Sequence, residues 1–194
     1  MMQEERGQAI AAAKRLMEQD PVVIDTETTG MEQDAEIVEL AAVNRAGQPL
    51  VNTLVHATRP VKPGARDVHG ISDADLQGAP GIHEAIRQLQ ETAGDRPLAA
   101  YNADFDRRML QSSLRAAAQQ GETPHDFPPH IHCVMLLYAR FRGNWNSYHR
   151  TYTFHGLMRA LEYEGLTVEG EPHRALTDAR AAMLLLQFMA DAEG

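Results

Sequence analysis

The chain has 194 residues, an ordinary 43% of them hydrophobic, and a formal net charge of -9 at pH 7. This length suits one well-packed domain and is short for two. The acidic balance argues against a broad polyanion-binding face, although metal ions and a local basic patch can still hold nucleic acid. Sixteen of the 18 cationic residues are Arg, which favours fork-like contacts to phosphate groups.

Cellular location is constrained by the absence of two sequence patterns. No apolar run reaches the length of a membrane span, and the first residues lack the basic and then apolar pattern of a signal peptide. The single cysteine, Cys133, excludes an internal disulfide and fits a reducing compartment. We therefore expect a soluble cytoplasmic protein with no membrane partner, whose oligomeric state the sequence does not decide.

The chain begins with a predicted helix and a predicted buried strand. Residues 4–18 carry Ile10, Leu16 and Met17 at helical spacing, which indicates an amphipathic helix that ends before Pro21. Residues 22–24 are consecutive β-branched aliphatics that lead directly into Asp25. This pattern is typical of a strand buried on both faces.

Two carboxylates stand at the end of this strand. Side chains alternate across a strand, so Asp25 and Glu27 point to the same face. Like charges beside an apolar core raise each other's pKa, and a divalent cation with hard oxygen ligands, Mg²⁺ or Mn²⁺, removes the conflict. The alternative is that Asp25 only ends the strand and that residues 28–30 form a turn.

The middle of the chain is predicted to complete an antiparallel meander and then to lose regular structure. Ser72, followed by Asp73 and Asp75, is a candidate start of a short helical turn within an irregular segment. Long irregular segments inside a compact domain are more often functional than idle. The expected elements are strands at 36–43 and 49–57, the irregular segment at 58–80, a helix at 82–92 and a strand at 98–101.

A second group of polar residues follows the strand at 98–101. Asn102 is placed to cap a helix over 103–119, and Asp106 falls in the first turn of that helix. Acids in a first helical turn are stabilised by the helix N-terminus, which alone accounts for Asp104 and Asp106. Taken in isolation, this pattern does not require a catalytic role.

Residues 131–137 are predicted to run from a short strand into a helix, with His130, His132 and Cys133 near its start. Together with His125 these side chains suggest a zinc site, but their spacing matches no familiar pair of two-ligand knuckles. Cys133 is more simply a small buried residue.

Residues 138–152 differ in composition from the rest of the chain. They hold three arginines, the only tryptophan, four other aromatics and no carboxylate. In an acidic protein this favours a nucleic-acid-facing loop in which Arg142 contacts phosphate and Trp145 stacks on a base. The alternative is a helix end whose aromatic residues are part of the core.

The last group of polar residues, His173 and Asp178, follows a helix predicted over 153–163 and opens the final helix. Five helical residues turn a side chain by about 500°, so the two would face apart if both lay in the helix. Pro172 favours a loop position for His173, where an imidazole near an ionised acid suits proton transfer. A capping or surface histidine is the alternative.

The three groups taken together resemble the DEDD exonuclease superfamily in its histidine-bearing branch, which includes the proofreading ε subunit of bacterial replicases, RNase T and oligoribonuclease. The matching motifs are Asp25-x-Glu27, Asn102-x-x-Phe105-Asp106 and His173-x4-Asp178, with residues 68–71 also similar. The resemblance implies an α/β, RNase H-like fold with a central mixed five-stranded sheet whose first three strands are antiparallel. It divides the chain into an N-terminal helix at 1–20 and an exonuclease domain at 21–194.

The resemblance also implies the roles of individual residues. The acids Asp25, Glu27, Asp106 and Asp178 would ligate two Mg²⁺ or Mn²⁺ ions, and His173 would be the general base for the attacking water. It places Thr26, Thr28, Met31 and His69 where the family holds the terminal nucleotide. Further substrate contacts are expected from Asn102 and Phe105 and, on the composition of their segment, from Arg142 and Trp145. Tyr101 departs from the family by replacing a common His, and the 138–152 loop is longer than expected.

We therefore expect a stand-alone, metal-dependent 3′-to-5′ exonuclease acting on single-stranded DNA or DNA 3′ ends in repair or replication, with a DNA polymerase or repair protein as a possible partner. An exoribonuclease of the same branch is the nearest alternative, because no residue identifies a test of the 2′-hydroxyl. A non-catalytic binding module on the same fold and a metal phosphatase acting on mononucleotides are alternatives from other classes.

Overall fold

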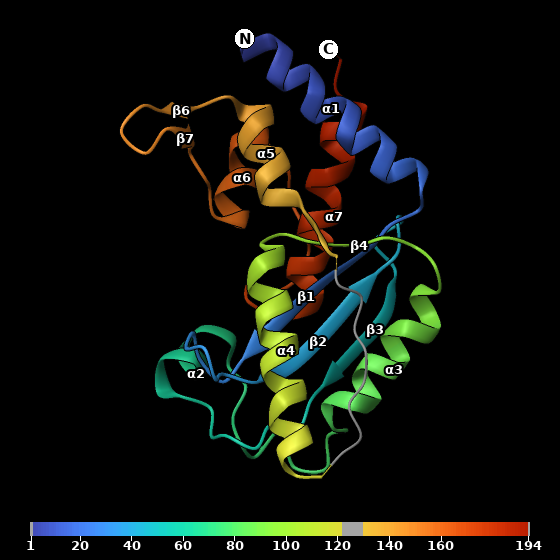
Figure 1. Cartoon of the computed structure of the whole chain (residues 1–194), viewed down its shortest axis with the longest axis vertical. Helices are drawn as coiled ribbons and strands as arrows, with labels where there is room; N and C mark the ends of the chain where they lie inside the picture. Colours follow the sequence, from blue (N-terminus) through green and yellow to red (C-terminus); the bar gives the residue numbers. More distant parts are fainter. Residues whose placement is uncertain (1, 122–129, 194) are drawn as a thin grey trace.

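A five-stranded mixed sheet forms the centre of the molecule, as the computed structural model shows for residues 2–121 and 130–193 (Figure 1). Its order is β3-β2-β1-β4-β5, with β1 paired antiparallel to β2 and parallel to β4. The strands are β1 (Val22–Thr28), β2 (Ile37–Val43), β3 (Pro49–Leu54), β4 (Leu98–Ala100) and β5 (His132–Cys133). The predicted mixed sheet with an antiparallel first half is confirmed.

Helices cover both faces of this sheet (Figure 1). One face packs against α1, α5, α6 and α7, and the opposite face packs against α3 and α4. The helices are α1 (Met2–Glu18), α2 (Pro63–His69), α3 (Ile82–Ala93), α4 (Ala103–Gln119), α5 (Val134–Arg142), α6 (Leu157–Glu164) and α7 (Ala175–Asp191). A second, two-stranded sheet pairs β6 (Trp145–Asn146) with β7 (Thr151–Tyr152).

Alternation along β1 divides the core into two layers. Val23 packs with α1 and α7, whereas Val22 and Ile24 pack with α3 and α4. All three side chains are fully buried, which explains the uninterrupted aliphatic run. The strand β1 is the middle strand of the sheet and is hydrogen-bonded to β2 on one side and to β4 on the other.

Several predicted boundaries are wrong for local reasons. Residues 58–80 contain α2, a seven-residue helix that starts at Pro63 and ends at the left-handed Gly70, and is too short to show a helical period. The helix expected from residue 153 begins only at Leu157. Ser72, by contrast, starts a turn as predicted, because its carbonyl accepts the Asp75 N–H at 3.0 Å while its own N–H and hydroxyl donate to Asp75 Oδ2. The strand β1 continues to Thr28, so the alternative in which it ends at Asp25 is wrong.

The arginine and aromatic segment at 138–152 combines the two structures that were considered for it. Tyr138 and Phe141 are buried core residues on α5, whereas Trp145 and Tyr148 are 53% and 88% exposed on the β6–β7 hairpin. This hairpin projects from the end of the molecule where α5 and α6 lie (Figure 1). Among the described residues, no helix combines the length and apolar composition that a membrane crossing requires.

Candidate active site

Three of the predicted acids meet on the face of the sheet that α7 covers. Asp25 and Glu27 project from β1, and Asp178 lies in the first turn of α7. One carboxylate oxygen from each of the three residues lies within 4.8 Å of the other two. In the described part of the chain, this is the one group of three His, Cys, Asp or Glu side chains close enough to share a metal ion.

The fourth acid reaches the site from the opposite layer. Asp106 lies in the first turn of α4 and is 3% exposed. Its Oδ1 accepts a hydrogen bond of 2.9 Å from the hydroxyl of Thr26, which projects from the other face of β1. This bond holds Asp106 at the residue between Asp25 and Glu27. After burial, the charge of Asp106 is the largest cause that raises the pKa of Asp25.

Burial raises the pKa of every acid in this group. Burial is the largest cause in each case, and the neighbouring acids add to it for Asp25 and Glu27. The pKa of Glu27 is raised to about 8, and that of Asp106 to about 7. The pKa of Asp178 is also raised, although His173 opposes the shift. Such a cluster of hard oxygen donors fits divalent cations, which would remove the repulsion.

His173 lies in the loop before α7, as predicted. It is exposed, and its backbone adopts a left-handed φ of +61°. Its N–H donates to Asp178 Oδ1 at 3.3 Å, so the backbone of the predicted base is tied to one of the acids. A non-glycine residue in this region of φ and ψ costs free energy and persists where its surroundings hold it.

Glu39 is a site residue that the sequence interpretation missed. It is 3% exposed on β2, directly opposite Glu27, and its carboxylate binds the Arg174 guanidinium and the Ala175 N–H. Every residue of β2 is buried, so one Glu in an otherwise apolar run was the available signal. A buried carboxylate requires a partner, and here that partner is the residue after His173.

His69 and Thr28 hold the end of β1. The Ile71 N–H donates to His69 Nδ1 at 3.1 Å, which leaves the proton on Nε2 to donate to the Thr28 carbonyl, also at 3.1 Å. The Thr28 hydroxyl in turn donates to the Gly30 carbonyl at 2.7 Å. Both ring nitrogens of His69 are therefore engaged within the chain, and burial lowers its pKa, which favours this neutral form.

The other predicted substrate residues differ in position. Met31 is 76% exposed beyond the end of β1. Asn102 is exposed at the N-cap of α4, but the cap prediction is wrong in detail, because its carbonyl and not its side chain accepts the Phe105 N–H. Phe105 is partly buried with the guanidinium of Arg108 5.7 Å above its ring.

Arg142 and Trp145 belong to a different part of the surface. Arg142 is turned toward α6, where it lies 3.5 Å from Glu164 and 4.9 Å above the ring of Tyr163. Trp145 packs edge to face against Tyr152 across the hairpin, with ring centroids 5.2 Å apart. The structure therefore does not place these two side chains with the four acids.

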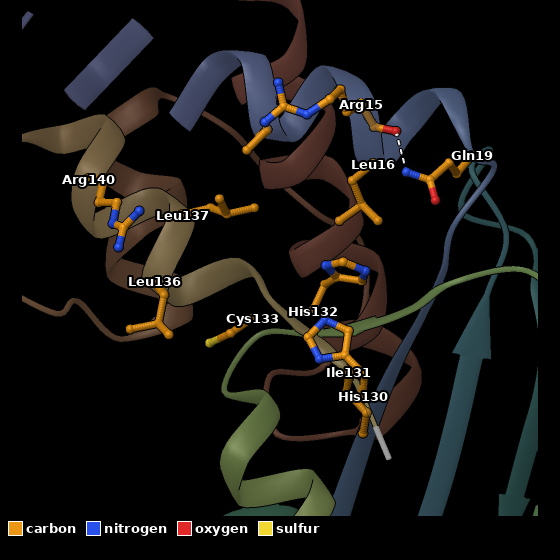
Figure 2. A pocket seen from close by; sticks show the side chains of 11 residues that line it. Arg15, Leu16, Gln19, His130, Ile131, His132, Cys133, Leu136, Leu137 and Arg140 are labelled. Carbon is orange, nitrogen blue, oxygen red and sulfur yellow. Dashed lines mark hydrogen bonds between the residues drawn. The ribbon is translucent and has the colours of Figure 1, made fainter. Parts of the chain in front are cut away.

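Three residues of the suggested zinc site, His130, His132 and Cys133, line a pocket of about 480 Å³ between α1, β5 and α5 (Figure 2). The rings of His130 and His132 meet edge to face at 4.5 Å, and the Cys133 thiol donates to the Tyr101 carbonyl at 3.3 Å. The described residues form no metal-binding group here. His125 lies outside the described residues.

Comparison with known proteins agrees with this geometry. The sequence profile of an exonuclease family, RNase T, matches residues 22–186. The uncharacterized exonuclease CP81 of Escherichia phage 186 is 37% identical over 182 residues, which are 92% of this chain and 92% of that protein. The PolC-type DNA polymerase III of Bacillus subtilis is 33% identical over 190 residues, which are 95% of this chain but 12% of the polymerase.

A solved structure supports the same assignment. Exonuclease X in complex with 5′ overhanging duplex DNA is 28% identical, with a TM-score of 0.63, and the match covers 89% of this chain and 94% of that one. The predicted RNase H-like arrangement is thereby confirmed. The chain belongs to the RNase T exonuclease family and is an exonuclease.

Proposed function

We propose that the protein removes nucleotides from the 3′ end of DNA by metal-dependent phosphodiester hydrolysis. The observation that carries the proposal is the meeting of Asp25, Glu27 and Asp178 within 4.8 Å, with Asp106 beside Asp25. DNA is favoured over RNA because the structure of exonuclease X, 28% identical, contains duplex DNA. Replication is a reasonable context, because PolC-type polymerases contain a similar region.

The four acids Asp25, Glu27, Asp106 and Asp178 would hold two Mg²⁺ or Mn²⁺ ions. When bound, such ions activate water and stabilise a leaving 3′ oxygen. The exposed imidazole of His173 takes the proton of the attacking water. The hydrogen bond from the His173 N–H to Asp178 holds its loop beside the acids. Thr26 donates to the Asp106 carboxylate and so opposes the rise that burial causes in its pKa.

The substrate end is held by residues around the end of β1 and the start of α4. Met31, Asn102 and Phe105 contact the terminal nucleotide, and Thr28 and His69 fix the strand end beneath it. Trp145 stacks on a base farther from the reacting end, because its ring is half exposed on the projecting hairpin. Arg142 contacts phosphate only if it leaves Glu164.

Some expectations about context remain proposals. The division into a helix at 1–20 and an exonuclease domain at 21–194 stays a prediction, and α1 shares a core cluster with α7. A DNA polymerase or a repair protein is the partner to test. A cytoplasmic location also stays a prediction.

Incubation of end-labelled single strands of DNA and RNA with Mg²⁺, Mn²⁺ or EDTA tests the proposal. The expected result is a ladder from the 3′ end of DNA that EDTA abolishes. Faster cleavage of RNA would identify an exoribonuclease, and binding without cleavage would identify a non-catalytic module. Hydrolysis of mononucleotides alone would identify a phosphatase.

A further inference from the structure

The loop that carries His173 is fastened to the sheet by one buried carboxylate. Glu39 Oε2 accepts the Arg174 Nε–H at 3.2 Å and the Ala175 N–H at 2.9 Å, and Oε1 accepts from Arg174 at 2.5 Å. These contacts fix the two residues that follow His173, including the first residue of α7. We call this set of contacts between Glu39, Arg174 and Ala175 the β2–α7 clasp.

Glu39 is placed differently from the four acids. Although it faces Glu27 across the strands, both of its oxygens are already engaged by donors, and it is absent from the group that can share a metal ion. The charge of Glu39 raises the pKa of Glu27, and the positive charge of its partner Arg174 lowers it. The clasp therefore places a charge pair, of which Glu39 is buried and Arg174 partly exposed, beside the cluster without adding a ligand.

The backbone of His173 requires such support. Its φ of +61° is unfavourable for a residue with a Cβ, and its side chain is exposed rather than packed. The backbone is held on one side by Asp178, through the His173 N–H, and on the other by the clasp. Loss of the clasp leaves the imidazole free to move, while the acids on β1 keep their places.

We propose that Glu39 is a positioning residue that sets the location of the general base His173 through Arg174 and the start of α7. This inference rests on the proposed function, which makes His173 the general base. The contacts that hold the loop do not depend on that function. Misplacement of a reacting group by about 1 Å can cost about 100-fold in rate. The clasp therefore contributes to turnover and not to substrate affinity.

Limited trypsin digestion tests the fastening without any activity measurement. Trypsin cuts after Arg174 only when that side chain leaves Glu39, so Glu39→Gln should speed cleavage of the Arg174–Ala175 bond, by about 10-fold for a loss of 1.4 kcal/mol of local stability. Cleavage after Arg150, on the hairpin, should not change. Equal cleavage after Arg174 in the variant and the parent protein would overturn the clasp.

Glu36→Gln is the matched control, because Glu36 is also 3% exposed and binds Thr58 and Arg59 on another part of the surface. Glu36→Gln should lower the melting temperature about as much as Glu39→Gln does. It should leave the rate of cleavage after Arg174 and the kcat close to those of the parent protein. If Glu36→Gln accelerates cleavage after Arg174 as much as Glu39→Gln does, the effect is general destabilisation and the proposal fails.

Kinetics with a labelled DNA strand test the role. Glu39→Gln should lower kcat by about 10- to 100-fold with KM unchanged. Arg174→Lys keeps the positive charge but not the guanidinium group that binds both carboxylate oxygens, so its kcat should fall less. Calorimetric titration with Mn²⁺ should give the parent affinity for both variants. A large loss of Mn²⁺ affinity in Glu39→Gln would make Glu39 a ligand, and a raised KM with normal kcat in Arg174→Lys would make Arg174 a substrate contact. Either result overturns the positioning role.

The two proposals fail in different ways. If the parent protein degrades neither DNA nor RNA, the proposed function fails, while the trypsin comparison still decides whether the clasp holds the loop. If the parent protein is active and Glu39→Gln retains full kcat, the positioning role fails and the exonuclease proposal stands.

Discussion

Thr26 donates its hydroxyl hydrogen to Asp106 across 2.9 Å, and this bond joins the central strand to the first turn of α4. The bond lowers the pKa of Asp106, which burial otherwise raises. Thr26→Val removes the donor at nearly constant volume, so the pKa of Asp106 should rise further and Mn²⁺ affinity near neutral pH should fall. The stability cost should be about 1 kcal/mol. Titration calorimetry and thermal unfolding measure these effects, and Thr26→Ser, which keeps the hydroxyl, should restore the affinity.

Asp25→Ala should abolish exonuclease turnover while preserving the fold. Without metal, the melting temperature should rise, because Asp25 is repelled by Asp106, Asp178 and Glu27 and its pKa is raised. Adding Mn²⁺ should stabilise the parent protein more than the variant. Scanning calorimetry with and without EDTA gives these values, and full activity in Asp25→Ala would contradict the assignment of this residue as a ligand.

Stability of the metal-free protein should depend on Glu27 in a defined pH range. The pKa of Glu27 rises from 4.5 to about 8 on folding, so the folded protein holds this proton more tightly than the unfolded chain. Protonated Glu27 therefore stabilises the folded protein fully below 4.5, its pKa in the unfolded chain, and this stabilisation is lost as the pH rises through about 8.

This pH effect can be isolated by comparing the parent protein with Glu27→Gln in EDTA. The melting temperature of Glu27→Gln, relative to that of the parent protein, should increase as the pH rises from about 5.5 to about 8.5. Mn²⁺ should raise the melting temperature of the parent protein more at the higher pH, where binding displaces fewer protons. A difference that does not depend on pH would show that Glu27 titrates normally.

Trp145→Ala should weaken binding of single-stranded DNA by about 1–3 kcal/mol if a base stacks on the ring. Because Trp145 is 53% exposed, the melting temperature should change little. Fluorescence anisotropy with a labelled strand and a catalytically inactive background measures the affinity. Leu136→Ala is the control, because Leu136 is also a half-exposed apolar side chain but lies on α5. This variant should bind single-stranded DNA normally.

The sequence predicts the central sheet well because its strands are strongly apolar and bounded by turn residues. β2 was expected at 36–43 and is found at Ile37–Val43, and α4 was expected at 103–119 and is found at Ala103–Gln119. The short helix α2 was missed, since seven residues give no helical period. Phe154 was wrongly assigned to the helix that begins at Leu157, because an apolar residue at the right spacing looks the same inside and outside a helix.

The proposed catalytic group was predictable for a different reason. Asp25, Glu27, Asp106, His173 and Asp178 stand in motifs that resemble a known family, and the structure brings three of their acids within 4.8 Å. The clasp was not predictable in the same way. Glu39 lies on β2 and Arg174 immediately before α7, and only the fold places these two residues in contact.

The site is divided between an early and a late part of the polypeptide. The strand with Asp25 and Glu27 leaves the ribosome before His173 and Asp178, which lie just before α7 and in its first turn. A nascent chain that ends before α7 therefore lacks the proposed base and one of the acids. A nuclease built in this order becomes able to attack nucleic acid only after α7 has been synthesised.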